Sequence, residues 1–147
     1  MMVAEDDMDG FNSFARPYMG ENYARETVTT KTWDAFAGLH KLAGIVTLMK
    51  IDVEGWELKV LSGGRNLLSR EDAPVLQVEF TDGAAKAAGS SCQEIYRSLE
   101  SLGYKIYKHD RVTKTLNPDP IRQEYPYLNL YAIKNLAAAQ LRLNGVE

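Results

Sequence analysis

The chain has 147 residues, of which 45% are hydrophobic and 25% are charged, and its formal net charge is −3. This length and composition predict one globular domain with a buried core, and the weak negative charge gives no electrostatic reason to expect nucleic acid or an anionic membrane as a partner. The single cysteine, Cys92, excludes an internal disulfide and a cysteine-based zinc site.

The N-terminal segment, residues 1–26, is polar and contains Gly10, Pro17 and Gly20, so we expect it to be mostly irregular. Its start is acidic and lacks the apolar stretch of a secretory signal. No apolar run in the sequence reaches the roughly 18–20 residues of a membrane helix. We therefore expect a cytoplasmic protein without a membrane partner, or a protein whose targeting segment lies outside this chain.

The next elements begin an alternation of strands and helices. The β-branched and aromatic run 27–33 predicts a short strand. A helix is predicted over 34–44, with Asp34 as its N-cap and Gly44 as its stop. The run 45–52 is almost continuously apolar, which is typical of a strand in a parallel sheet that is covered on both faces.

The middle of the chain continues the same pattern. A helix is predicted over 56–70, and it is expected to break or tighten at Gly63 and Gly64, because each glycine weakens a helix by about 1 kcal/mol. A second buried strand is predicted over 73–80. A helix follows over 90–103, with a serine at its N-cap.

The C-terminal part contains two further strands with no helix between them. We predict a strand over 104–110, a loop over 111–126, a strand over 127–134 and a final helix rich in alanine and leucine. Alternating strands and helices predict an α/β fold with parallel strands joined by right-handed crossovers. The loop between the last two strands permits an antiparallel pair at the edge of the sheet.

Acidic residues follow the two most apolar strands. Asp52 and Glu54 stand at the end of the first strand, and Glu79 and Asp82 at the end of the second. Ligands of open α/β sheets bind beyond the carboxyl ends of the strands, and neighbouring strands lie about 4.8 Å apart. We therefore expect these carboxylates to face one crevice, where a cation, a proton or a hydrogen-bonding ligand must be shared. The alternative is that they cap the following helices and face water.

Three functions are possible for a group of carboxylates at this position. The stretch IDVEGW has a superficial similarity to the nucleophile loop of haloacid-dehalogenase-like phosphatases, but Glu54 and Trp56 stand where that loop has an aspartate and a hydroxyl residue. Two or three carboxylates could also hold Mg²⁺, although nothing in the sequence demands a metal. The third function rests on a more specific resemblance.

The segment LMKIDVEGWELKVLSGGRNLL, followed by APVLQVEFTD, resembles the characteristic segment of the FkbM family of S-adenosylmethionine-dependent methyltransferases. That family shows a KIDVEG-x-E-x-x-VL-x-G run and then an apolar strand with Val-Glu at its centre. The residues 50–55, Glu57, Val60, Leu61 and Gly63 stand in the places of that run. The similarity covers roughly residues 10–134.

The resemblance implies a fold, a cofactor and roles for several residues. The fold is a partial Rossmann-like methyltransferase sheet, equivalent to the fourth to seventh strands, mostly parallel with an antiparallel last strand. Residues 27–147 would form the C-terminal part of the domain. S-adenosylmethionine would be the methyl donor, and the hydroxyl of a sugar or small metabolite would be the acceptor. The implied catalytic residues are Asp52, Glu54 and Glu79, the implied cofactor contacts are Asp52 and Gly55, and no metal ligand is implied.

The part of the domain that would bind the donor is not found in the sequence. It should precede residue 27 and contain a glycine-rich turn, followed by an acid about 20 residues later. We therefore expect poor or no donor binding, and an unpaired flank on the strand 45–52. The competing hypothesis is a non-catalytic remnant that acts as a binding or assembly module and covers its open edge by dimerising or by pairing with another chain.

Overall fold

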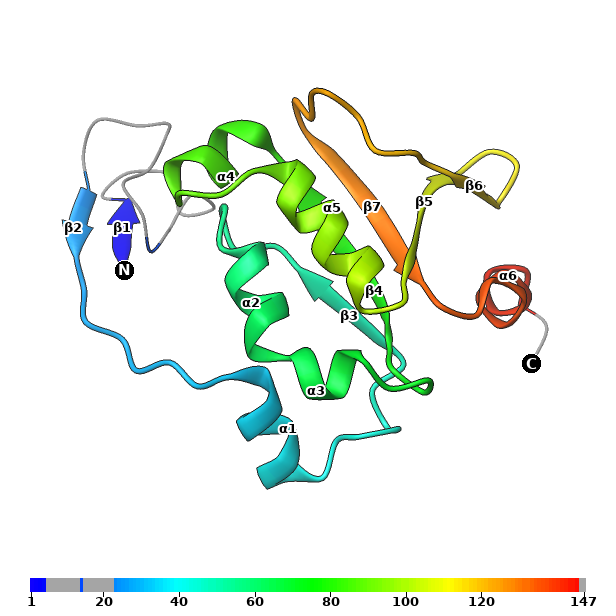
Figure 1. Cartoon of the computed structure of the whole chain (residues 1–147), viewed down its shortest axis with the longest axis horizontal. Coiled ribbons are helices and arrows are strands. Elements are labelled where there is room, and N and C mark those ends of the chain that lie inside the picture. The colour runs from blue at the N-terminus through cyan, green and yellow to red at the C-terminus, as the bar shows by residue number, and fades with distance from the viewer. Residues whose placement is uncertain (5–13, 15–22, 146–147) are drawn as a thin grey trace.

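The computed structural model describes residues 1–4, 14 and 23–145. In chain order its elements are β1 (Met2–Ala4), β2 (Tyr23–Arg25), α1 (Trp33–His40), β3 (Leu48–Ile51), α2 (Glu57–Gly63), α3 (Arg65–Leu68), β4 (Val75–Phe80), α4 (Asp82–Ala87), α5 (Cys92–Ser101), β5 (Lys105–Asp110), β6 (Thr115–Pro118), β7 (Leu128–Ile133) and α6 (Leu136–Leu143) (Figure 1). β3 to β7 form one sheet in the order β3-β4-β7-β5-β6, and β1 and β2 form a separate antiparallel ribbon.

The sheet has one parallel pair and three antiparallel pairs. β3 pairs with β4 in parallel, whereas β4–β7, β7–β5 and β5–β6 are antiparallel. The expectation of an α/β fold with an antiparallel last strand is confirmed, but the expectation of mostly parallel pairing is wrong. The reason is that β7 inserts between β4 and β5, so these two strands run in the same direction without being neighbours.

A further strand lies in the segment 111–126, which the sequence predicts to be a loop. β6 forms a hairpin with β5 and occupies the edge of the sheet, so the antiparallel pair β5–β7 lies in the interior. The Asp110 carboxylate accepts hydrogen bonds from the N–H groups of Val112 and Thr113, and Lys114 adopts a left-handed conformation. This turn contains no glycine, so the usual hairpin signal is missing from the sequence.

The helices in the middle of the chain follow the sequence prediction closely. α2 ends at Gly63 and α3 begins after Gly64, which confirms the break. A Cβ atom on Gly64 would lie 2.8 Å from the Trp33 side chain, so a residue without a side chain permits the close approach of α1. The N-cap of α5 is Ser91, whose hydroxyl accepts a hydrogen bond from the Glu94 N–H.

The start of α1 differs from the prediction. Its N-cap is Thr32, whose hydroxyl accepts a hydrogen bond from the Ala35 N–H. Asp34 lies in the first turn instead, and its carboxylate accepts hydrogen bonds from the N–H groups of Asn66 and Leu67, at 3.0 and 2.9 Å. The acid therefore caps α3, which is distant in sequence, rather than its own helix.

The predicted strand over 27–33 is not observed, and this prediction is wrong. Residues 26–32 form no regular element, and α1 ends at His40, with the left-handed Lys41 as its C-cap, rather than at Gly44. A strand forms only where a neighbour accepts its backbone hydrogen bonds. Within the described ranges, no strand of either sheet pairs with this segment.

The main core lies between one face of the sheet and the helices α1, α2, α3 and α5. Its fully buried side chains come from the strands, from the inner faces of the helices and, in the case of Tyr125, from the segment before β7: Ile51, Leu61, Leu68, Leu76, Val78, Phe80, Ile95, Leu99, Tyr125 and Leu130. On the opposite face, α6 covers a small second cluster of Tyr107, Leu116, Ile133 and Ala139. The helices therefore cover one face of β3 and β4 more completely than the other.

β3 is not covered on both faces, which corrects the interpretation of its apolar sequence. Ile51 is buried, but Leu48 is 57% exposed and Ile45, just before the strand, is 67% exposed. β3 stands at the end of the sheet, so the expected unpaired flank is present in the described structure.

The N-terminal segment was expected to be mostly irregular, and most of it, residues 5–13 and 15–22, lies outside the described residues. Its described part includes the two short strands β1 and β2. The division of the chain at residue 27 stays a prediction. Among the helices of the described residues, none has the length and apolar character needed to cross a membrane.

Candidate functional site

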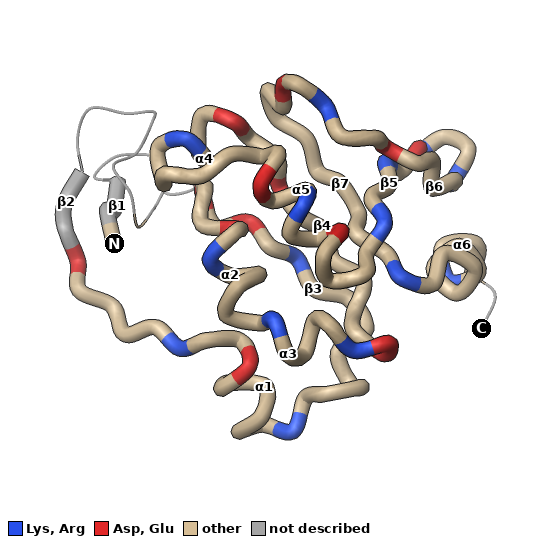
Figure 2. The backbone as a smooth tube through the Cα atoms, viewed as in Figure 1, with Lys and Arg blue, Asp and Glu red and all other residues tan. Residues whose placement is uncertain are grey.

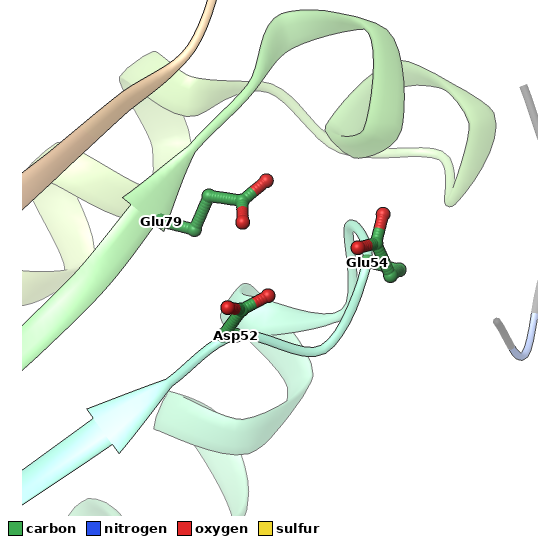
Figure 3. A group of neighbouring side chains, drawn as sticks. All are labelled: Asp52, Glu54 and Glu79. Carbon is green, nitrogen blue, oxygen red and sulfur yellow. The ribbon is translucent and has the colours of Figure 1, made fainter. Parts of the chain in front are cut away.

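Three carboxylates meet where β3 and β4 end. Because these strands are parallel and in register, with Ile51 opposite Val78, their carboxyl ends lie side by side. Figure 2 shows acidic residues where the chain leaves β3 toward α2. Asp52, Glu54 and Glu79 offer oxygen atoms that all lie within 4.8 Å of one another, and their carboxylates point into one space (Figure 3). The predicted gathering of these three acids is therefore observed, whereas their roles stay predictions.

The fourth acid of the sequence prediction, Asp82, is engaged elsewhere. Its carboxylate accepts a hydrogen bond of 2.6 Å from the Tyr125 N–H, and its own N–H donates to the Tyr125 carbonyl at 2.9 Å. Asp82 thus fixes the segment before β7 to the start of α4. This acid has a structural role that the sequence did not reveal.

The turn after β3 depends on an unusual backbone. Glu54 and Gly55 both have positive φ values, of 51° and 95°. A Cβ atom on Gly55 would lie 2.1 Å from the carbonyl oxygen of Ala84, in α4. Only glycine fits this position, because both the conformation and the contact exclude a side chain. The turn therefore packs directly against α4 and projects Glu54 beside the other acids.

Glu57 holds this turn from the first residue of α2. Its side chain is buried, and its carboxylate accepts hydrogen bonds from the N–H groups of Val53, at 3.1 Å, and Gly55, at 3.3 Å. Burial raises the pKa of Glu57, and these N–H groups oppose the rise. From the sequence, the helix dipole alone could explain this acid, because its partners become visible only once the left-handed turn is known.

Lys50 partly neutralises the crevice. Its ammonium group lies 2.7 Å from the Asp52 carboxylate, and the Asp52 side chain is 29% exposed. The hydrogen bond and charge of Asp52 raise the pKa of Lys50. The sequence motif contains both residues, but only their alternate positions along one strand place them on the same face.

Glu79 is the most buried of the three acids. It is 6% exposed, and burial raises its pKa to about 7, with further increases from the neighbouring Asp52 and Glu54 carboxylates. The Thr81 hydroxyl donates a 2.7 Å hydrogen bond to it and opposes this rise. Burial likewise raises the pKa of Glu54. Near neutral pH, Glu79 therefore exists in both its protonated and its ionised form.

This arrangement can do three things chemically. It can attract a cationic ligand, hold a hydroxyl group by hydrogen bonds, and accept a proton at Glu79 near neutral pH. Three carboxylate oxygens also match the ligand preference of a divalent cation. Clusters of this kind are common without an ion, and the ammonium of Lys50 already supplies positive charge to one member.

A cavity of about 1160 Å³ adjoins the same turn. Val53 and Trp56, from the turn, line it together with Trp33, Phe36 and the extended segment 26–32. Trp56 also contacts the ring of Phe14 edge-on, with the ring centres 5.5 Å apart. The turn after β3 therefore contributes Val53 and Trp56 to this cavity, whereas none of the three acids lines it.

The sequence of this site belongs to a recognised domain. A family model described as the methyltransferase FkbM domain matches residues 3–106, which include all three acids, the turn and Glu57. The chain belongs to the FkbM methyltransferase family. This confirms the resemblance inferred from the KIDVEG segment. No curated protein and no solved structure matches the chain.

Proposed function

We propose that this FkbM-family chain carries the acceptor side of a methyltransferase site, which serves O-methylation of a sugar or small-metabolite hydroxyl by S-adenosylmethionine. The observation that supports this function is the meeting of Asp52, Glu54 and Glu79 within 4.8 Å at the adjoining ends of β3 and β4. Their negative charge fits the cationic sulfonium centre of the donor. Neither nucleic acid nor a membrane is expected as a partner.

The chemistry assigns different tasks to these acids. When bound, S-adenosylmethionine would supply an electrophilic methyl group attached to a positively charged sulfur, and this sulfur would keep the electrons of the broken carbon–sulfur bond as a neutral thioether. The acceptor hydroxyl loses its proton as the new carbon–oxygen bond forms. Glu79 is suited to take this proton, because a base with a pKa of about 7 is matched to neutral pH. Asp52 is suited to orient the hydroxyl, and Glu54 adds negative charge beside it.

We infer that this chain alone binds the donor weakly or not at all. Before Gly44 its sequence contains only Gly10, Gly20 and Gly38, which form no glycine-rich turn of the kind that lets a backbone approach a nucleotide. Calorimetric titration with S-adenosylmethionine tests this inference. We expect no measurable binding at micromolar donor, and micromolar affinity would contradict the inference.

The transfer reaction is tested with methyl-labelled S-adenosylmethionine and a panel of sugars and hydroxylated metabolites. The protein is expressed from its complete reading frame, with Asp52→Asn and Glu79→Gln as variants and Glu100→Gln, an exposed acid on α5, as the matched control. We expect each site variant to lower transfer at least about 100-fold, and the control to retain it. Unchanged transfer in both site variants would show that the reaction does not use this crevice.

A binding or assembly module is the second candidate, and the exposed flank of β3 favours it. The two candidates differ in the reading frame upstream of Met1. A continuous frame that encodes a strand and a glycine-rich turn would favour the enzyme. A stop codon directly upstream would favour the module.

A further inference from the structure

The side chain of Thr81 lies at the start of α4 but does not cap this helix. Thr81 is the N-cap residue, and its carbonyl accepts a helical hydrogen bond from the Ala85 N–H at 3.0 Å. A threonine at this position usually accepts a further hydrogen bond, with its hydroxyl, from an N–H group of the first turn. Within the described residues, the Thr81 side chain accepts no such bond from α4.

Three other helices of the described structure have the usual cap. The side chains of Thr32, Ser91 and Asn135 accept hydrogen bonds from the N–H groups three residues later, at 3.2, 3.2 and 3.0 Å. Thr32 gives the direct comparison with Thr81, because it is the same residue type at the same position of a helix. The two threonines therefore differ in the partner of the hydroxyl and not in its place along the helix.

The partner of the Thr81 hydroxyl is the carboxylate of Glu79. Oγ1 of Thr81 donates to Oε1 of Glu79 at 2.7 Å, and both residues are buried. They stand two positions apart where β4 ends, so their side chains leave the same face of the sheet. The hydrogen bond holds one carboxylate oxygen and thereby restricts the rotation of the whole group, which points toward Asp52 and Glu54 (Figure 3).

The electrostatic surroundings of Glu79 oppose its ionisation. The titratable groups that interact with it come from β3, the turn after β3 and α5: Lys50, Asp52, Glu54 and Cys92. Burial raises the pKa of Glu79 most, and the two neighbouring carboxylates raise it further. Burial also raises the pKa of the Cys92 thiol above its usual range, so this thiol stays neutral. On β7, the residue in register with Glu79 is Asn129, which does not titrate. The Thr81 hydroxyl acts in the opposite direction to the carboxylates, because it donates to the ionised form of Glu79.

We propose that Thr81 is a positioning residue of the site, whose hydroxyl is directed to the Glu79 carboxylate instead of the N-terminus of α4 and holds that carboxylate in the crevice. A donor of this kind stabilises an ionised carboxylate, so it also limits how strongly the crevice retains a proton. The inference rests on the proposed function in one respect, because it makes Thr81 act through Glu79 as the base of the reaction. The hydrogen bond itself is testable in this chain without methyl transfer.

Carbon-13 NMR of chains labelled at the glutamate carboxyl groups measures the titration of Glu79, and Glu79→Gln identifies its signal. Thr81→Val keeps the shape of threonine without the hydroxyl, and it should raise the pH midpoint of Glu79 by about one unit. Thr81→Ser keeps a hydroxyl and should titrate like the wild type. An unchanged midpoint in Thr81→Val would overturn the proposal.

Urea denaturation at pH 5 and pH 9 separates this role from helix capping. Loss of a donor to the ionised form raises the folded pKa of Glu79, so more stability is lost as the pH rises through that pKa. The ratio of the folding equilibrium constants of wild type and Thr81→Val should therefore grow about tenfold between the two pH values. In a Glu79→Gln background this growth should disappear.

Thr32→Val is the matched control, because it removes a threonine hydroxyl that does cap its helix. Its stability should fall by the same factor at both pH values, since the hydrogen bond it removes joins two groups that do not titrate. A loss in Thr81→Val that is equally independent of pH would show that the Thr81 hydroxyl serves only the fold, and it would overturn the proposal.

The pH–rate profile of the complete reading frame tests the step that depends on the proposed function. If Glu79 is the base, the acidic limb of kcat/KM should move to higher pH in Thr81→Val, as far as the NMR midpoint moves, and should return in Thr81→Ser. A limb that stays in place while the NMR midpoint moves would contradict Glu79 as the base, and hence the proposed function, but would support the hydrogen bond from Thr81.

Discussion

The carboxyl ends of β3 and β4 lie side by side, but the acids that follow them are held in opposite ways. After β4, Asp82 exchanges two hydrogen bonds with the backbone of Tyr125. At the crevice, Asp52 and Glu79 face each other, with Lys50 and Thr81 as their partners. The Asp82 carboxylate thus accepts a hydrogen bond from one backbone N–H group, whereas the carboxylates of Asp52 and Glu79 approach a like charge.

This difference distinguishes Asp82, which we expect to stabilise the fold, from Asp52 and Glu79, which we expect to bind a ligand. The hydrogen bond from the Tyr125 N–H to the Asp82 carboxylate joins two distant segments of the chain, so Asp82 should favour folding. Carboxylates that approach each other in a partly buried crevice oppose folding until a proton or cation is shared, and such clusters concentrate at functional sites. The comparison is open to direct measurement through stability.

The largest effect is expected for the glycine of the turn. Gly55→Ala places a Cβ atom 2.1 Å from the Ala84 carbonyl oxygen at a φ of 95°, so we expect a loss of at least about 3 kcal/mol in the free energy of unfolding. Urea denaturation measures it. The control is Gly89→Ala, whose φ is 77° but whose added Cβ would meet no atom within 4 Å; it should lose only about 1 kcal/mol. Equal losses would show that the contact with α4 is unimportant.

The next effect is a dependence of stability on pH. The pKa of Glu79 is about 7 in the folded chain against an ordinary value of 4.5, so its stabilising contribution is complete below pH 4.5 and is lost as the pH rises through 7. The free energy of unfolding of the wild-type chain should therefore fall by at most about 3 kcal/mol across this range. We expect this fall to be absent in Glu79→Gln. Urea titrations from pH 4 to 8 measure it, with Glu100→Gln as the exposed control. If the free energy of unfolding changes equally with pH in Glu79→Gln and in the wild type, a group other than Glu79 is responsible for the pH dependence.

A smaller effect is expected at Glu57. Glu57→Ala leaves the N–H groups of Val53 and Gly55 without their acceptor in the buried turn, which should cost about 1–3 kcal/mol. Glu57→Gln keeps an acceptor oxygen and should retain most of this stability. Thermal unfolding at neutral pH compares the two. If both variants lose the same amount, the charge of Glu57 matters more than its hydrogen bonds.

The features that the sequence predicts correctly are local or follow from strand direction. The helix break at Gly63 and Gly64 and the cap at Ser91 depend on a few neighbouring residues. The gathering of Asp52, Glu54 and Glu79 needs only two parallel strands that end together. Each of these rests on physics that acts within one element or between adjacent ones.

The features that it misses depend on distant partners. Nothing in the run 127–134 specifies that β7 inserts between β4 and β5, and the hairpin to β6 forms without a glycine signal. Asp34 resembles an N-cap but binds α3, and Asp82 resembles a site acid but binds Tyr125. An acid in a sequence shows where charge lies along the chain, and only the fold shows which donors it meets.

The smallest change in stability is expected at the residue predicted to matter most for the reaction. Asp52→Ala removes a partly exposed acid whose partner, Lys50, is itself 59% exposed, so we expect a change within about 0.5 kcal/mol. Asp82→Ala removes the acceptor of the Tyr125 N–H and should lose about 1–2 kcal/mol. Urea denaturation of both variants measures the contrast. In the complete reading frame, Asp52→Ala should abolish methyl transfer while preserving the fold. An Asp52→Ala chain as destabilised as Asp82→Ala would mean that both acids serve the fold, and the distinction between the two strand ends would then fail.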